Sequence, residues 1–175
     1  MSESHERWKQ MIRSVKDFPE PGIDFKDITP LLADARALRE VVDEMAERHS
    51  ASRIDAVCGI EARGFILAAP VALKLGAGFV PIRKHGKLPH RREAASYQLE
   101  YAEAVLEIHA DAVSPGDHVL IVDDVLATGG TARAAADLVQ RLGATVSGVT
   151  CLIELGFLDG RAKLPGLDTH FLINY

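Results

Sequence analysis

The sequence has few cysteines and aromatic residues and no long apolar run. Among its 175 residues are two cysteines and one tryptophan, and no apolar stretch approaches the roughly 18 residues of a membrane-spanning helix. The polar N-terminal residues 1–10 lack the apolar core of a secretory signal, so we expect a cytoplasmic protein. Cys58 and Cys151 lie inside apolar stretches and are expected to be buried thiols.

The sequence also lacks the features of a metal centre and of a nucleic-acid surface. Its seven histidines and two cysteines show no metal-ligand spacing, so no permanent metal site is predicted. The formal net charge of -5 argues against a nucleic-acid partner, which requires many neutralised phosphates. Residues 83–92 are nevertheless strongly basic, and such a cluster is either a solvated loop or an anion site. Its basic side chains are Arg83, Lys84, Lys87, Arg91 and Arg92.

The apolar pattern predicts strands that alternate with helices. Leu38, Val41, Val42 and Met45 recur at helical spacing behind Asp34, a candidate N-cap. Short apolar runs without alternation indicate strands that are covered on both faces. The expected helices are residues 4–16, 34–50, 63–75 with a kink at Pro70, and 131–142. The expected strands are 54–60, 78–82, 118–122 and 145–153, with a hairpin at 97–101 and 104–109.

This alternation predicts one α/β domain over residues 1–175, a doubly wound and mostly parallel sheet. Ligands of such folds bind at the carboxyl ends of the strands, which here follow Ile60, Ile82 and Val122. Between residues 83 and 96 the apolar pattern disappears, and loops of that length are often lids over a binding site.

The strand end at residues 119–131, VLIVDDVLATGGT, carries the chemistry. Glycines and free N–H groups at a helix start form a phosphate site, although the segment is neither a Walker loop nor a G-x-G-x-x-G turn. Carboxylates would repel phosphate, but two acceptors suit the two hydroxyls of a sugar diol. The motif therefore predicts a ribose 5-phosphate site. Asp123 and Asp124 could instead cap a turn, but the order of strand, acids, glycines and helix favours the ligand site. Its residues are Asp123, Asp124, Ala127, Thr128, Gly129, Gly130 and Thr131.

This motif resembles that of phosphoribosyltransferases that use 5-phosphoribosyl-1-pyrophosphate. Further segments resemble the adenine-specific family, and together they cover nearly the whole chain. The resemblance implies the type I phosphoribosyltransferase fold, with an N-terminal hood segment at 1–33 and a flexible catalytic loop at 84–98. It also implies a homodimer. The resembling segments are FPEPGIDFKDITPLL at 18–32, GIEARGF at 59–65, PIRKHGKLP at 81–89 and YQLEY at 97–101.

The resemblance implies that adenine and 5-phosphoribosyl-1-pyrophosphate are converted to AMP and pyrophosphate, as in purine salvage. Phe25 would stack on the base, backbone groups around Asp24 and Lys26 would read its edge, and Val125 would pack on the other ring face. Glu100 is the candidate acid/base group for the proton that adenine loses. Mg²⁺ is expected to arrive with the substrate. Cations that stabilise the departing pyrophosphate would be Arg63, Arg83, Lys84 and Lys87.

Two other readings stay open at this point. A phosphoribosyltransferase for hypoxanthine, guanine or xanthine would need reversed donors and acceptors, typically with a lysine at the carbonyl oxygen, and only Lys26 is a candidate. A regulator that senses phosphoribosyl pyrophosphate while binding DNA or RNA would need an added basic domain or face. Phe25, Arg63 and Glu100 could each also be ordinary core or surface residues.

Overall fold

A computed structural model describes residues 3–98 and 103–175 of the chain, which divides into two compact units, Met1–Glu44 and Met45–Tyr175. The first unit contains α1 (Glu3–Met11), an antiparallel pair of β1 (Arg13–Lys16) and β2 (Asp24–Asp27), α2 (Thr29–Ala33), and most of α3 (Ala35–Glu47). The expected helix 4–16 is wrong beyond Met11. Val15 pairs with Phe25 in the two-stranded sheet, because strand pairing outweighs the weak helical preference of so short a segment.

The predicted cap of α3 is confirmed. The Asp34 carboxylate accepts hydrogen bonds from the amides of Arg36 (3.0 Å) and Ala37 (2.8 Å), which satisfies donors that have no partner inside the helix. Val41, Val42 and Met45 are buried at the expected spacing.

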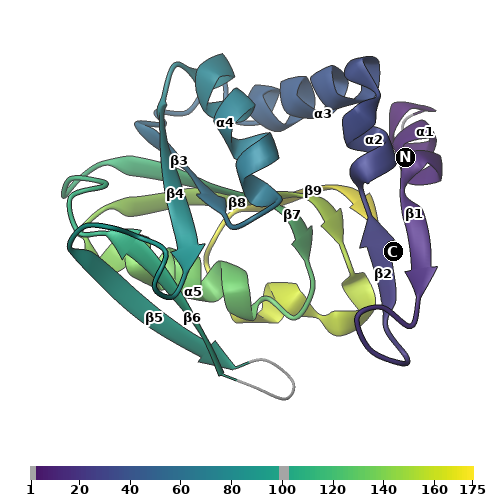
Figure 1. The fold of residues 1–175 in the computed structure, drawn as a ribbon. Coiled ribbons are helices and arrows are strands. Elements are labelled where there is room, and N and C mark those ends of the chain that lie inside the picture. Colours follow the sequence, from purple (N-terminus) through teal and green to yellow (C-terminus); the bar gives the residue numbers. More distant parts are fainter. Residues whose placement is uncertain (1–2, 99–102) are drawn as a thin grey trace. The chain divides into compact units, whose positions relative to one another are not determined.

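The second unit is built on a seven-stranded mixed sheet in the order β5-β6-β4-β3-β7-β8-β9, with α4 and α5 on opposite faces (Figure 1). The strands from β4 to β9 through β3, β7 and β8 are parallel, whereas β6 pairs antiparallel with both β4 and β5. The predicted doubly wound, mostly parallel α/β class is confirmed. The elements are β3 (Ala56–Ile60), α4 (Gly64–Leu75), β4 (Gly78–Lys84), β5 (Arg92–Gln98), β6 (Glu103–His109), β7 (His118–Leu126), α5 (Gly130–Arg141), β8 (Thr145–Glu154), the 3-10 turns η1 (Gly156–Leu158) and η2 (Gly160–Lys163), and β9 (Thr169–Asn174).

The core of this unit explains why its strands read as continuous apolar runs. β7 lies between β3 and β8, and Val119, Leu120, Ile121 and Val122 are fully buried. Their side chains point to alternate faces of the sheet, and both faces are apolar because α4 covers one and α5 the other. This burial holds the carboxyl end of β7, where the acidic motif lies, in a fixed position.

Three element boundaries differ from the prediction. β7 continues to Leu126 by pairing with β8, so the two aspartates lie within the strand rather than after it. The predicted helix 63–75, by contrast, is confirmed as α4, which includes Pro70. Half of the expected loop 83–96 is strand: β4 extends to Lys84 and β5 begins at Arg92, so residues 85–91 connect the two. β5 lies at the sheet edge, where charged residues are common, so its sequence shows no apolar strand pattern.

Candidate active site

The two predicted sugar-binding acids lie side by side at the end of the central strand. The Asp124 amide donates a hydrogen bond to Oδ1 of Asp123 (2.9 Å), and Asp124 is only 4% exposed. Burial raises the pKa of both carboxyls; Asp124 raises that of Asp123 further, whereas Arg63 opposes the increase at Asp124. Two buried acids with raised pKa values are arranged for ligand hydroxyl donors, which stabilise the charged form.

Arg63 is brought directly onto this pair. It precedes α4, and its Nε lies 2.6 Å from Oδ2 of Asp124. Gly64 permits the approach, since a Cβ there would lie 2.7 Å from Oδ1 of Asp123. The end of β3 and the end of β7 thus place a cation beside the acids, where a sugar and a leaving anion could meet.

The glycine loop after β7 encloses a cavity of about 270 Å³. Gly129 has a φ of 78° and immediately precedes the helix α5. A Cβ on Gly129 would lie 2.2 Å from the Gly160 carbonyl oxygen, and a Cβ on Gly160 would lie 2.2 Å from that of Ala127. The two backbones therefore touch, which no side chain would allow. The cavity is lined by Asp123, Val125, Leu126, Ala127, Thr128, Gly129, Thr131, Ala132 and Cys151.

Part of the basic segment is paired with a half-buried acid, Glu61, that sequence reasoning missed. Glu61, only 8% exposed in its side chain, lies 2.7 Å from Nζ of Lys87 and 3.3 Å from Nε of Arg83, and it accepts the Lys84 amide (3.0 Å). Burial raises the pKa of Glu61, but Lys87, the Lys84 amide and Arg83 together lower it to about 2. Arg83 and Lys87 are therefore ion-paired, whereas the Lys84 side chain is exposed.

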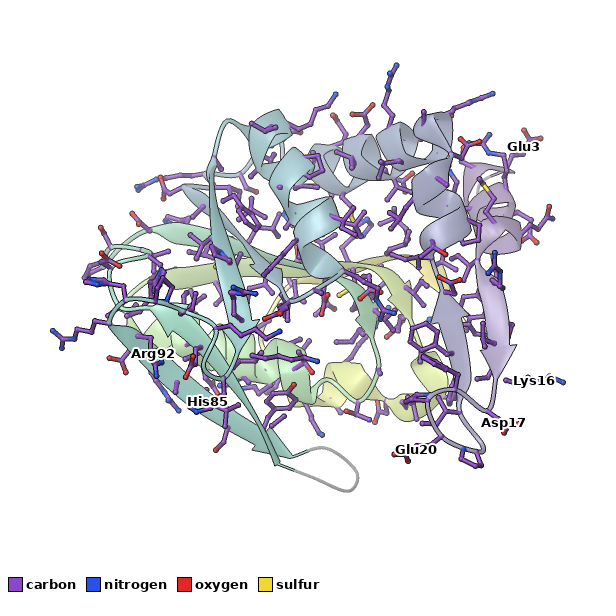
Figure 2. All side chains as sticks on the ribbon, viewed as in Figure 1. Glu3, Lys16, Asp17, Glu20, His85 and Arg92 are labelled. Carbon is purple, nitrogen blue, oxygen red and sulfur yellow. The ribbon has the colours of Figure 1, made fainter. Side chains whose placement is uncertain are left out.

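A second missed acid, Glu107, holds the other half of the same segment. Its carboxylate bonds to Nδ1 of His85 (2.7 Å), the Gly86 amide (3.0 Å) and Nε of Arg92 (2.9 Å), and Figure 2 labels His85 and Arg92. Burial raises the pKa of Glu107, but these three donors lower it. The hairpin predicted at 97–101 and 104–109 was expected to have one solvated face. That expectation is wrong at Glu107, which is 1% exposed because residues 83–92 fold over it. In the alternating sequence LEIH at 106–109, a buried glutamate looks the same as a solvent-exposed one.

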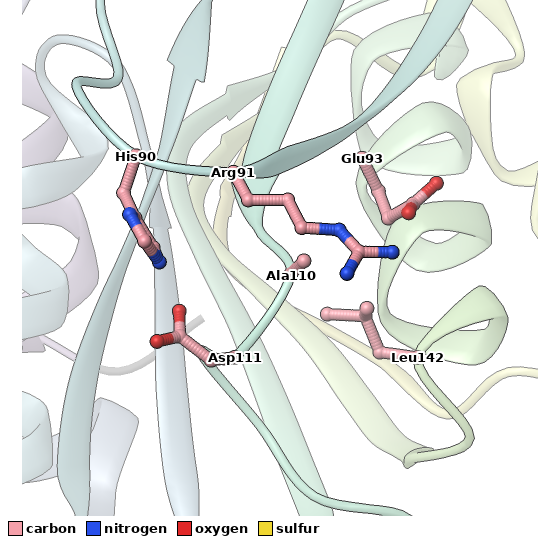
Figure 3. A pocket seen from close by; sticks show the side chains of 6 residues that line it. All are labelled: His90, Arg91, Glu93, Ala110, Asp111 and Leu142. Atoms are coloured by element: carbon pink, nitrogen blue, oxygen red, sulfur yellow. The ribbon is translucent and has the colours of Figure 1, made fainter.

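A larger cavity of about 370 Å³ lies elsewhere on the second unit and does not have this chemistry. In Figure 3, Arg91 extends toward Leu142 and Glu93, while Asp111 lies below His90. Two acids accompany the arginine, and no glycine loop or helix N-terminus lines it, so it is a poorer phosphate site.

The predicted base-binding residues of β2 belong to the first unit, which is described by itself. Asp24, Phe25 and Lys26 form β2 of the first unit, where Phe25 makes an edge-to-face contact with Phe18 at 5.2 Å and Lys26 pairs with Asp24 (2.8 Å). Glu100 lies outside the described residues. Cys58 and Cys151 are confirmed as buried free thiols, and burial raises the pKa of Cys58 to about 12. Among residues 3–98 and 103–175, no three His, Cys, Asp or Glu side chains are grouped to hold a metal ion, and no helix is long and apolar enough to cross a membrane.

The acidic pair near the end of the central strand, the glycine loop that opens α5 and Arg63 beside them all lie within one stretch of the chain that matches a known family. Residues 30–169 match the phosphoribosyl transferase domain family. The adenine phosphoribosyltransferase of Thermobifida fusca is 60% identical over 161 residues, covering 92% of each chain. The crystal structure of the Rhodothermus marinus enzyme matches with a TM-score of 0.95 at 51% identity, covering 98% of each chain. The Saccharomyces cerevisiae enzyme, complexed with adenine and an imino-altritol bisphosphate, matches with a TM-score of 0.92 at 36% identity, covering 98% of this chain and 99% of that one.

The chain belongs to the adenine phosphoribosyltransferase family, and it has the type I phosphoribosyltransferase fold.

Proposed function

We propose that this chain transfers the 5-phosphoribosyl group from 5-phosphoribosyl-1-pyrophosphate to adenine, which yields AMP and pyrophosphate for purine salvage. The observation that carries the proposal is the buried pair Asp123 and Asp124 beside the glycine loop, with Arg63 on Asp124. An acidic pair would repel a ligand that is only a phosphate, but it suits a ribose that carries one. The yeast relative named above binds adenine, which supports the choice of base.

In this proposal the ribose diol donates to Asp123 and Asp124. The 5-phosphate lies in the loop Ala127–Thr131, where amides at the start of α5 and the hydroxyls of Thr128 and Thr131 donate to it. The close contact between the Gly129 and Gly160 backbones supports this role, because it holds the loop amides in place before the ligand binds.

The leaving pyrophosphate would lie against Arg63, Arg83, Lys84 and Lys87. Charge develops on the departing oxygens as the bond to C1 of the ribose lengthens, and fixed cations stabilise that charge. Arg63 is the best placed of the four, because its contact with Asp124 keeps it beside the sugar.

Mg²⁺ is proposed to enter with the pyrophosphate. The strand end offers two carboxylates, and Asp124 is paired with Arg63, so they are too few for an all-protein cage and fit an ion that keeps its ligands from substrate and water. When bound, Mg²⁺ would neutralise charge on the pyrophosphate.

The base would be held by Phe25, by backbone groups of Asp24 and Lys26, and by Val125, with Glu100 accepting the proton that adenine loses. Phe25 is half-buried and Val125 lines the strand-end cavity, each as a base-contacting residue requires.

The proposed enzyme is a cytoplasmic homodimer that binds neither membranes nor nucleic acid. The support for a dimer is an exposed apolar stripe on α4: Ile66, Pro70 and Leu73 recur at helical spacing, and Leu73 is 82% exposed.

The test is a spectrophotometric assay with phosphoribosyl pyrophosphate and Mg²⁺, in which adenine, hypoxanthine and guanine are offered separately. We expect turnover of adenine alone, and a loss of at least about 100-fold in kcat/KM in the double variant Asp123→Asn/Asp124→Asn. Turnover of an oxopurine would disprove the adenine assignment. Tight substrate binding without turnover of any base would favour the regulator.

A further inference from the structure

Arg83 and Lys87, two of the cations proposed to bind pyrophosphate, already have an anionic partner in Glu61. Glu61 follows β3 and its amide donates to the Ile82 carbonyl oxygen (2.9 Å), so its side chain lies beside the end of β4. One Oε lies 2.7 Å from Lys87 Nζ, and the other is approached by Arg83 Nε at 3.3 Å and the Lys84 amide at 3.0 Å. These are the groups that a pyrophosphate would need.

The contacts of Glu61 differ from those of an ordinary surface ion pair. Its side chain is 8% exposed, whereas those of Arg83 and Lys87 are 33% and 49% exposed. The Glu61 carboxylate is therefore shielded from solvent, while Arg83 and Lys87 remain accessible to solvent and to a ligand. Two cations share one carboxylate, so one positive charge is left for an incoming anion.

We propose that Glu61 is the resident counter-ion of the pyrophosphate subsite: it holds Arg83 and Lys87 in position and competes with pyrophosphate for them. This inference rests on the proposed function. Glu61 is a positioning residue, because it acts through the two cations and touches no reacting atom. Binding of pyrophosphate exchanges one set of ion pairs for another, so the leaving group is bound loosely enough to depart.

The experiment measures pyrophosphate affinity by titration calorimetry in the presence of Mg²⁺, with AMP as a second ligand that occupies the base, ribose and 5-phosphate sites but not the pyrophosphate site. Glu61→Gln keeps the size of the side chain and removes its charge. We expect pyrophosphate to bind about tenfold more tightly, since the competing negative charge on the same cations is lost, while the Kd for AMP stays within about twofold. The KM for phosphoribosyl pyrophosphate should fall in parallel without a rise in kcat.

Two further variants separate competition from a purely structural role. Glu107→Gln is the matched control, because it removes another buried carboxylate that holds the same segment through His85 and Arg92; its pyrophosphate affinity should stay within about twofold of wild type. Glu61→Asp restores the charge and should return the affinity toward the wild-type value.

Unchanged or weaker pyrophosphate binding in Glu61→Gln would overturn the inference, as would an equal gain in Glu107→Gln. Failure of the proposed function would instead appear in the wild-type protein, which would then neither bind pyrophosphate nor convert adenine, and both proposals would fall.

Discussion

At the scale of single residues, Gly129 is the position where the site tolerates least change. Ala at a φ of 78° is strained, and its Cβ would also meet the Gly160 carbonyl oxygen at 2.2 Å. We expect Gly129→Ala to destabilise the protein by about 3 kcal/mol and to weaken AMP binding at least about tenfold, as followed by thermal unfolding and calorimetry.

Gly116→Ala separates these two causes. Gly116 has a φ of 87°, and a Cβ at this position would have nothing within 4 Å, so the substitution should cost only the strain of about 1 kcal/mol and leave AMP affinity unchanged. Equal losses in both variants would show that the contact with Gly160 is unimportant.

At the scale of elements, the segment after α3 is attached to β8 through a buried histidine. Nε2 of His49 lies 2.8 Å from the Thr150 hydroxyl, and His49 is 3% exposed. Burial lowers the pKa of His49; Asp168 raises it, and Arg48 and His170 lower it further.

The sign of the resulting pH dependence follows from that lowered pKa. As the pH falls through about 6.5, His49 binds a proton in the unfolded chain before it does so in the folded one. Stability present above pH 7 is therefore lost toward lower pH. Between pH 7.5 and 5.5 we expect the wild-type Tm to fall about 2–4 °C more than that of His49→Gln, which corresponds to roughly 1 kcal/mol.

The exposed His90 provides the control for this titration. His90→Gln should follow the wild-type curve of Tm against pH. If His49→Gln follows it as well, protonation of His49 does not contribute to acid destabilisation.

At the scale of the whole molecule, the exposed stripe on α4 has to be covered if the protein is a dimer through this helix. Placing a charge at Leu73, which is 82% exposed in the chain, would bury that charge at the interface. We expect Leu73→Glu to weaken the dimer by about 2–3 kcal/mol, roughly 30- to 150-fold, as measured by sedimentation velocity across a concentration series.

Gln140→Glu on the exposed side of α5 is the matched control and should leave the association unchanged. A dimer that survives Leu73→Glu with the same affinity would place the interface on another surface.

The sequence alone determined the class of fold and the part of the site that residues 123–131 form. Continuous apolar runs such as residues 119–122 identify strands buried on both faces, and the order of acids, glycines and helix in residues 123–131 is a local pattern that dictates its own geometry. That Arg63 and Asp124 lie at the same edge of the sheet was foreseeable, since the parallel neighbours β3 and β7 have their carboxyl ends at that edge.

Only the tertiary structure decided which charges meet. Glu61 and Glu107 look like solvated acids in the sequence, yet their side chains are only 8% and 1% exposed and are paired with cations from residues 83–92. Residues 13–16 became a strand only through pairing with β2, and Gly160 supports Ala127 and Gly129 from more than 30 residues away. Periodicity reports whether a position faces a core, whereas burial of a charge depends on partners that are distant in the chain and that no local pattern encodes.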